Sequence, residues 1–142
     1  MSIQVNTILA LDVGGQRVGV AIASGEVKFA HPLTTLDKPE TVIDDIKELI
    51  SQHDVGTIVI GLPRGLNGQE TDQTATVRAF VEKLKTDMTI PFVFQDEALT
   101  SIKAEDELNK RGKVYSRGDI DALAATYILE DYIVENIGRN TI

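Results

Sequence analysis

The sequence predicts one α/β domain in which a mixed β-sheet of about five strands is flanked by helices. Two short apolar runs at its start, residues 7–13 and 17–24, are joined by Gly-Gly-Gln, which is typical of an antiparallel hairpin. Beyond residue 36, apolar residues recur in turn with helical and with strand-like spacing, which favours parallel strands joined by helical crossovers. Together these observations predict a three-stranded antiparallel meander followed by parallel strands.

Length and composition agree with a single domain over residues 1–142. Hydrophobic residues make up 42% of the chain and charged residues 25%, which is ordinary for a globular protein and enough for one core. The absence of cysteine excludes a disulfide framework and a Cys-based zinc site, and it favours a cytoplasmic location. The first residues lack the basic and apolar regions of a signal peptide, and no stretch approaches the roughly 20 apolar residues of a membrane span, so no membrane partner is expected.

The expected strands follow from apolar runs that end at turn-forming residues. The run 7–13 is apolar on both faces, which predicts a central position in the sheet. Residues 28–36 supply a third strand, in which Pro32 marks an edge or a bulge. A β-branched run at 55–63 ends at Gly-Leu-Pro and predicts a buried strand, and the last strand, 90–97, ends in two acids.

Four segments are expected to be helices, three of them from apolar residues at helical spacing and one polar. Asp37 and Glu40 resemble a capping box at the start of the first segment, and Gly112 can end the third, polar one. The fourth segment has the strongest pattern, with Ile120, Leu123 and Tyr127 in register. The expected helices span residues 37–53, 71–87, 100–111 and 119–137.

Asp12 lies at the end of the first expected strand and has two interpretations. Strand alternation places it on the same side as Ile8 and Ala10, where an uncompensated charge is costly. In the first interpretation, Asp12 caps the turn and accepts hydrogen bonds from the amides of Gly14 and Gly15. In the second, further acids meet Asp12 around a divalent cation that neutralises them.

Three other acids are candidates for that cation site. Asp96 and Glu97 end the last strand, and strand ends are where sites collect in layered α/β folds. Asp121 shares a helical stripe with two alanines that allow the helix to approach the sheet closely, whereas Asp119 suits a role in stabilising the helix dipole. Carboxylates without His or Cys suit Mg²⁺ or Mn²⁺, and two such ions can hydrolyse a phosphodiester. The residues do not decide between Asp96 and Glu97.

The net charge of −8 argues against binding of nucleic acid along a broad basic face. One basic stretch, 109–118, leads into the helix that carries Asp121. It can bind phosphates and stack on a base, or it can be a solvated loop whose cations favour the end of the preceding helix. The loop 63–71 with Arg64 is the other expected wall of the site. The candidate nucleic-acid-binding residues of 109–118 are Lys110, Arg111, Lys113, Tyr115 and Arg117.

Five motifs follow one another over nearly the whole chain: LDVGGQRVGVAIAS, AHPLTTL, IVIGLPRGLNGQET, QDEALTS and DIDALAATYILEDYI. In this order they resemble the YqgF/RuvX family, whose members are described as Holliday junction resolvases and as pre-16S rRNA nucleases. The resemblance implies an RNase H-like fold. It also implies that Asp12, Glu97 and Asp121 are the catalytic, metal-binding residues, with Asp96 as an alternative metal ligand.

The activity that this resemblance implies is that of a nuclease that uses Mg²⁺ or Mn²⁺. Its expected substrate is structured nucleic acid, either an RNA precursor in pre-16S rRNA processing during ribosome biogenesis or the branched DNA of a Holliday junction. The chain is expected to act as a monomer or a weak homodimer. Ala98 replaces the arginine of the family's Asp-Glu-Arg box, which leaves Arg17 or Arg64 to contact the phosphate.

Two other functions fit part of the sequence. Ala98 is compatible with a non-catalytic module that binds RNA or a ribosome-associated partner. The stretch LDVGGQ also fits the phosphate loop of actin-like ATPases. Such enzymes hold ATP between two RNase H-like domains, whereas the length of this chain supplies one.

Overall fold

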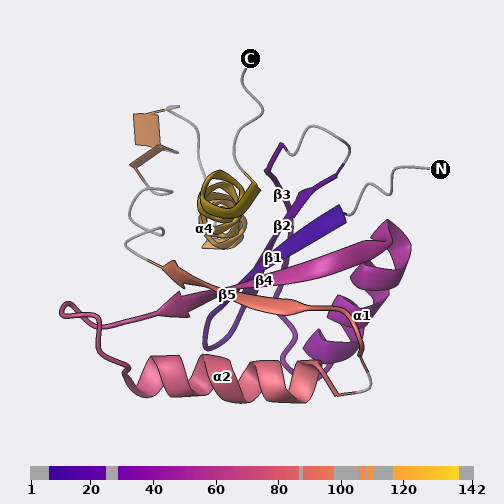
Figure 1. Ribbon diagram of the computed structural model, residues 1–142, viewed down its shortest axis with the longest axis horizontal. Helices are drawn as coiled ribbons and strands as arrows, with labels where there is room; N and C mark the ends of the chain where they lie inside the picture. Colours follow the sequence, from indigo (N-terminus) through magenta and orange to yellow (C-terminus); the bar gives the residue numbers. More distant parts are fainter. Residues whose placement is uncertain are drawn as a thin grey trace.

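The computed structural model describes residues 7–24, 29–86, 88–97, 106–107, 109–110 and 117–137. Its centre is a five-stranded sheet in the order β3-β2-β1-β4-β5 (Figure 1). The strands are β1 (Thr7–Val13), β2 (Val18–Ala23), β3 (His31–Leu36), β4 (Val55–Pro63) and β5 (Phe92–Glu97).

Strand pairing confirms the predicted mixed sheet. β1 pairs antiparallel with β2, and β2 pairs antiparallel with β3, so the first three strands form the expected meander. β4 then pairs parallel with both β1 and β5. The apolar strand β1 is central, as its sequence predicts, because both of its faces are covered. Its end at Asp12 pairs with Gly19 of β2, and the end of β5 at Glu97 pairs with Pro63 of β4.

Helices cover both faces of the sheet (Figure 1). α1 (Val42–His53) and α2 (Asp72–Leu84) lie on one face, and α4 (Arg117–Tyr132), which continues into the π-helix η1 (Ile133–Ile137), lies on the other. Alternate residues of β1 separate two cores: Leu9 and Leu11 pack toward α1 and α2, and Ile8 and Ala10 pack toward α4. No helix in the described part of the chain is both long enough and apolar enough to cross a membrane.

α4 packs unusually close to β2, and a glycine makes this approach possible. A Cβ atom on Gly19 would lie 2.0 Å from the carbonyl oxygen of Asp121, far inside van der Waals contact. Ala124 and Ala125 are fully buried on the same side of α4, as the predicted small-residue stripe requires. The first turns of α4 therefore lie directly against the strand that pairs with β1.

The expected capping box of the first helix is wrong. α1 begins at Val42 with Thr41 as its N-cap residue, and no side chain caps it. Pro39 disfavours helical backbone at the residue before it, and the amide of Thr41 donates to the carbonyl of Lys38 in a turn instead. Residues 37–41 thus lead into the helix rather than form its first turn.

Other element boundaries differ from the expected ones by a few residues. α2 begins after the N-cap residue Thr71, whose side chain forms a capping box with Thr74, and it ends three residues earlier than expected. The third strand begins at His31 rather than at residue 28. The last helix begins two residues early, at Arg117. Most of the expected helix 100–111 lies outside the described residues.

Candidate active site

Three acids from distant parts of the chain come together on the α4 side of the sheet. They are Asp12 at the end of β1, Glu97 at the end of β5 and Asp121 near the start of α4. The pKa of Asp12 is raised to about 8, first by burial, then by the charge of Glu97 and a hydrogen bond to its carboxyl group, and then by the charge of Asp121. A hydrogen bond between two carboxyl groups requires a proton, and the raised pKa places that proton on Asp12.

Gly61 of β4 leaves the space in which Glu97 lies. A Cβ atom at this position would lie 2.5 Å from Cδ1 of Ile128 and 3.3 Å from Oε2 of Glu97. β4 lies between β1 and β5, so a side chain here would stand between the two acids and α4. A glycine inside an apolar strand is a general sign of such a close approach, but which group approaches is visible only in the folded protein.

Asp121 is held by an arginine of the β1–β2 hairpin. The Nε of Arg17 donates to Oδ2 of Asp121 at 2.5 Å. The side chain of Arg17 is 33% exposed and that of Asp121 is 20% exposed, so the pair lies at the edge of the site with one side open to solvent. The sequence predicts Arg17 as a phosphate contact, and the structure adds that it neutralises one acid of the cluster.

Asp12 does not cap the turn through the amide of Gly14, as one interpretation of the sequence expected. The amide of Gly14 donates to the carbonyl of Arg17 at 2.9 Å, which closes the hairpin turn through backbone atoms. The carboxyl group of Asp12 is instead hydrogen-bonded to the carboxyl group of Glu97. The two-glycine turn thus brings Arg17 back beside the end of β1, where it pairs with Asp121.

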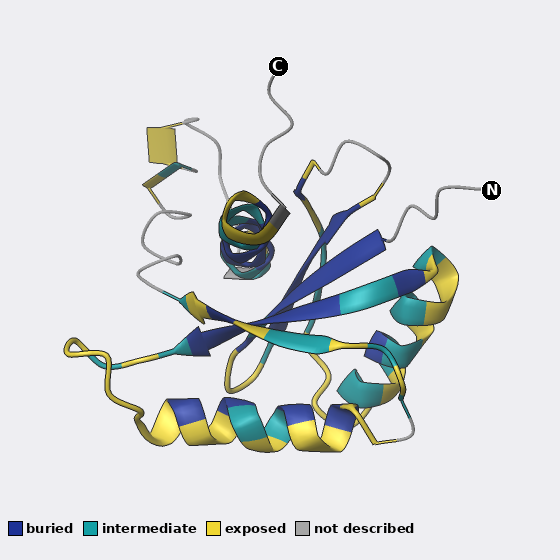
Figure 2. Ribbon diagram, viewed as in Figure 1, coloured by how far each residue is buried: buried dark blue, intermediate teal, exposed yellow. Residues whose placement is uncertain are grey.

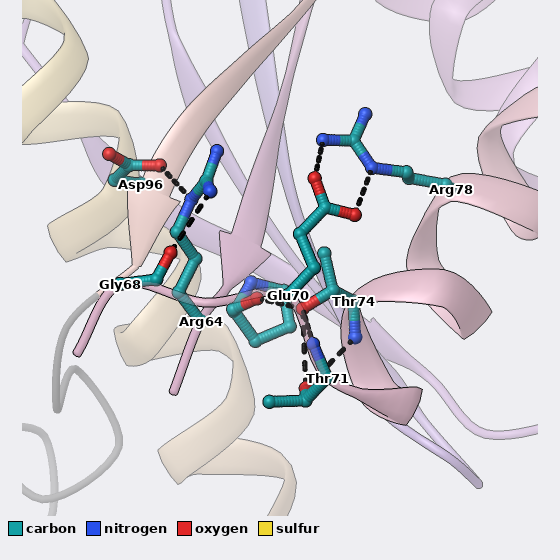
Figure 3. A network of polar contacts seen from close by, with 8 residues as sticks. Arg64, Gly68, Glu70, Thr71, Thr74, Arg78 and Asp96 are labelled. Carbon is teal, nitrogen blue, oxygen red and sulfur yellow. Dashed lines mark hydrogen bonds and ion pairs between the residues drawn. The ribbon is translucent and has the colours of Figure 1, made fainter. Parts of the chain in front are cut away.

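Asp96 lies apart from the cluster. Its Oδ1 accepts from the Nε of Arg64 at 2.9 Å, and its side chain is 74% exposed (Figure 3). Arg64 also donates to the carbonyl of Gly68 at 3.2 Å. Both residues of this pair were candidates for the site, Asp96 as a metal ligand and Arg64 as a phosphate contact, and each is engaged with the other.

The basic stretch 109–118 is largely beyond what the structure describes. Lys110 lines a surface hollow together with Tyr127 and Glu130 of α4. Arg111, Lys113 and Tyr115 lie outside the described residues, as does Ala98. Arg117 opens α4, and its side chain is not described. The geometry therefore bears on Arg17 and Arg64 but leaves the expected basic loop an expectation.

The donor chemistry of the cluster fits a hard divalent cation, although the side chains are not arranged as ligands. Within the described ranges, no group of three or more His, Cys, Asp or Glu side chains is placed to hold a metal ion. Asp12 and Glu97 are hydrogen-bonded to each other, and Asp121 faces Arg17. Buried carboxylates repel one another when ionised, and Mg²⁺ or Mn²⁺ with oxygen ligands removes that repulsion.

The chain is similar to curated nuclease sequences over most of its length. Residues 6–135 match the family described as "RuvX: Holliday junction resolvase". A relative from Chloroflexus aggregans, named "Putative pre-16S rRNA nuclease", is 40% identical over 131 residues, which cover 89% of this chain and 92% of that protein. A relative of the same name from Desulforudis audaxviator is 37% identical over 139 residues and covers 94% and 99%.

Two of the solved structures with a similar fold are RuvC from Thermus thermophilus and the Holliday junction resolvase of fowlpox virus. RuvC from Thermus thermophilus has a TM-score of 0.57 at 13% identity, covering 94% of this chain and 98% of that one. The resolvase of fowlpox virus has a TM-score of 0.53 at 12% identity, covering 92% and 99%. At this level of identity the likeness concerns the fold, and the expected RNase H-like fold is confirmed.

Proposed function

The chain belongs to the RuvX family of Holliday junction resolvases and is therefore a nuclease, and from this membership we propose that it hydrolyses phosphodiester bonds of structured nucleic acid with the help of a divalent cation. The observation that carries the proposal is the meeting of Asp12, Glu97 and Asp121 on one side of the sheet. We assign these three carboxylates as the catalytic, cation-binding residues of a single nuclease domain. Glu97 is preferred to Asp96 because its carboxyl group is hydrogen-bonded to that of Asp12, whereas Asp96 is paired with Arg64.

The cluster is suited to take up a cation in exchange for a proton and an arginine. At such sites Mg²⁺ or Mn²⁺ supplies an activated water and stabilises the leaving oxygen. For the acids to act as ligands, the proton between Asp12 and Glu97 must leave, so cation affinity rises with pH up to the raised pKa of Asp12. The half-exposed guanidinium of Arg17 must also release Asp121.

Arg17 then has a second partner available. A guanidinium forms paired hydrogen bonds with phosphate oxygens as readily as with a carboxylate. We propose that Arg17 holds Asp121 in the cation-free protein and binds a phosphate next to the scissile bond in the complex. This role replaces that of the family arginine at the position of Ala98.

For the substrate we propose an RNA precursor of the small ribosomal subunit, which places the protein in ribosome biogenesis in the cytoplasm. The names of the curated relatives support this choice. Branched DNA is the second candidate, supported by the family description and by the RuvC structure solved with a Holliday junction. Resolution of a junction needs two symmetric active sites and hence a dimer, whereas a monomer suffices to trim RNA.

The test compares cleavage of a labelled small-subunit rRNA precursor and of a four-way DNA junction in Mg²⁺, in Mn²⁺ and in EDTA. We expect cation-dependent cleavage by the wild type and a loss of about a hundredfold or more in Asp12→Asn. Asp44→Asn, an exposed acid of α1 on the opposite face, is the matched control and should cleave like the wild type. Cleavage by Asp12→Asn at the wild-type rate would contradict the assignment, and RNA binding without cleavage would favour the non-catalytic module.

A further inference from the structure

A fully exposed leucine lies at the tip of the loop between β4 and α2. The side chain of Leu66 is 101% exposed, more than that of Phe29, Phe94 or Val134, the other exposed large apolar residues in the described ranges. The loop, residues 64–70, extends beyond the end of β4 and is exposed except at Gly65, which is half-buried (Figures 1 and 2). A single exposed leucine is common on protein surfaces, so the case for a role depends on how this loop is built and where it lies.

The loop has a defined conformation of its own. The amide of Gly65 donates to the carbonyl of Gln69 at 2.8 Å, and the amide of Gly68 donates to the carbonyl of Gly65 at 2.9 Å. The amide of Asn67 donates to Oε1 of Gln69 at 2.9 Å. Gly68 has a φ of +79°, in the region that favours glycine. The side chain of Gln69 fills the space beside Gly65, where a Cβ would lie 2.2 Å from it, so the tip is closed by its own residues.

Both ends of the loop are fixed to the body of the protein (Figure 3). Arg64 bonds to Gly68 across the loop and to Asp96 of β5. On the other side, the Oγ1 of Thr74 in α2 donates to the carbonyl of Pro63 at 2.5 Å. These contacts fix the loop that carries Leu66, so Leu66 is exposed by a defined loop conformation.

The loop begins beside the acid cluster. Pro63, three residues before Leu66, pairs with Glu97 in the sheet. Three residues span at most about 11 Å, and nucleotides along one strand are about 3.4 Å apart. A strand that runs from the acids along this loop can therefore bring a base within about three nucleotides of the scissile phosphate next to Leu66.

We infer that Leu66 is a nucleobase contact, which packs against the face of a base at a branch or helix end and so positions structured nucleic acid for cleavage. Apolar side chains, leucine among them, insert between base steps and unstack them in many nucleic-acid complexes. One side chain on a short loop is far smaller than a stable protein interface, whereas it matches the face of one base. The inference rests on the proposed nuclease function and adds the residue that recognises structure.

The test uses 2-aminopurine, whose fluorescence rises when its base is unstacked, at each of the three nucleotides on either side of a branch. An RNA hairpin with single-stranded flanks and a four-way DNA junction carry the probe, and Ca²⁺ replaces the catalytic cation so that binding is read without cleavage. The variants are Leu66→Ala, Leu66→Met, which keeps an apolar side chain, and Val134→Ala, an exposed apolar residue of η1. Because Leu66 is fully exposed and Val134 is about half exposed, all three variants are expected to melt like the wild type.

We expect the wild type to raise the fluorescence at one probe position, and the substrate that responds identifies RNA or DNA. Leu66→Ala should lose that signal and bind the branched substrate about five- to tenfold more weakly, while single-stranded binding is unchanged. Leu66→Met should retain both properties, as should Val134→Ala. A normal signal in Leu66→Ala, or an equal loss in Val134→Ala, overturns the role of Leu66 and leaves the nuclease assignment intact. If the wild type binds neither substrate, the proposed function itself fails and this inference with it.

Discussion

Asp96 and Glu97 are neighbours in the chain, yet their carboxylates lie on opposite faces of the sheet. Glu97 points toward α4 and is hydrogen-bonded to Asp12. The side chain of Gln95, two residues earlier, also points this way and donates to Glu135 of η1 at 3.0 Å. Asp96 points to the other face and forms an exposed ion pair with Arg64. Phe94 points the same way, and Cζ of Arg78 in α2 lies over its ring, 5.1 Å from the ring centre.

Because side chains alternate along a strand, one of these neighbouring acids lies in the buried cluster and the other in an exposed ion pair. Burial beside other acids makes the charge of the Asp12–Glu97 pair costly, and a site that stores such cost is where catalytic groups are expected. An exposed ion pair such as Arg64–Asp96 contributes about 0–1 kcal/mol. Arg64 also donates to Gly68, so this pair links the loop after β4 to the end of β5.

The largest contrast is expected in activity. Glu97→Gln removes a proposed ligand and should lower the cleavage rate about a hundredfold or more. Asp96→Asn keeps the size of the side chain and should change the rate only a few-fold, through a looser loop. Single-turnover cleavage of the RNA precursor measures both variants. Equal losses in the two would show that the two faces do not differ in function.

A pH titration of stability sharpens the comparison from the buried side. The folded state holds a proton on Asp12 up to about pH 8, whereas the unfolded chain releases it near the ordinary value of 3.8. This proton therefore stabilises the fold at low pH, and the free energy of unfolding falls by at most about 1.4 kcal/mol per pH unit as pH rises between these values.

Asp12→Asn removes that dependence. Its stability relative to the wild type should therefore rise from pH 4 to pH 8 and be constant above. Urea unfolding at several pH values, without divalent cations, measures the difference. Parallel curves for the two proteins across this window would contradict the raised pKa.

Gly61→Ala should damage the buried side through packing. The added Cβ meets Ile128 at 2.5 Å and crowds Glu97, which should cost about 1–3 kcal/mol of stability and lower the cleavage rate. Ile128→Val removes the Cδ1 atom that the new methyl meets. In the double variant, Ile128→Val should therefore restore part of the stability that Gly61→Ala loses. Independent, additive losses would show that the two side chains do not compete for this space.

The smallest effect is expected at the exposed edge of the cluster. Arg17→Gln removes the cation that pairs with Asp121, so Mn²⁺ should bind about two- to fivefold more tightly in the absence of nucleic acid. Calorimetric titration with Mn²⁺ measures this change. RNA affinity should fall in the same variant, because the proposed phosphate contact is lost. Weaker Mn²⁺ binding would mean that Arg17 supports the site rather than occupying it.

Period-two and helical patterns predicted the mixed sheet and the faces on which Asp12 and Asp121 lie, whereas the grouping of these two acids with Glu97 was implied by the family resemblance. The alternation of β1 predicted that Asp12 shares a face with Ile8 and Ala10, and both lie in the core on the α4 side. The small-residue stripe predicted that Asp121 faces the sheet. These assignments succeed because they depend only on geometry within one element.

What the sequence left open depends on contacts between elements. The choice between Asp96 and Glu97 requires knowing which face of β5 meets α4. The pairing of Arg64 with Asp96 spans 32 residues, and no local pattern predicts it. The glycines at 19 and 61 were visible as letters of motifs, but their purpose depends on the path of α4 across the sheet.

The contact at Gly19 has a consequence for attempts to re-engineer this enzyme. A side chain at position 19 would collide with the backbone of α4 at Asp121, and no rotamer avoids that collision. The spacing between the hairpin and α4 therefore cannot be adjusted by a substitution at this position. A version built for a bulkier ion or another chemistry would need a rerouted loop ahead of α4. Substitution of individual acids would leave the distance between β2 and α4 unchanged.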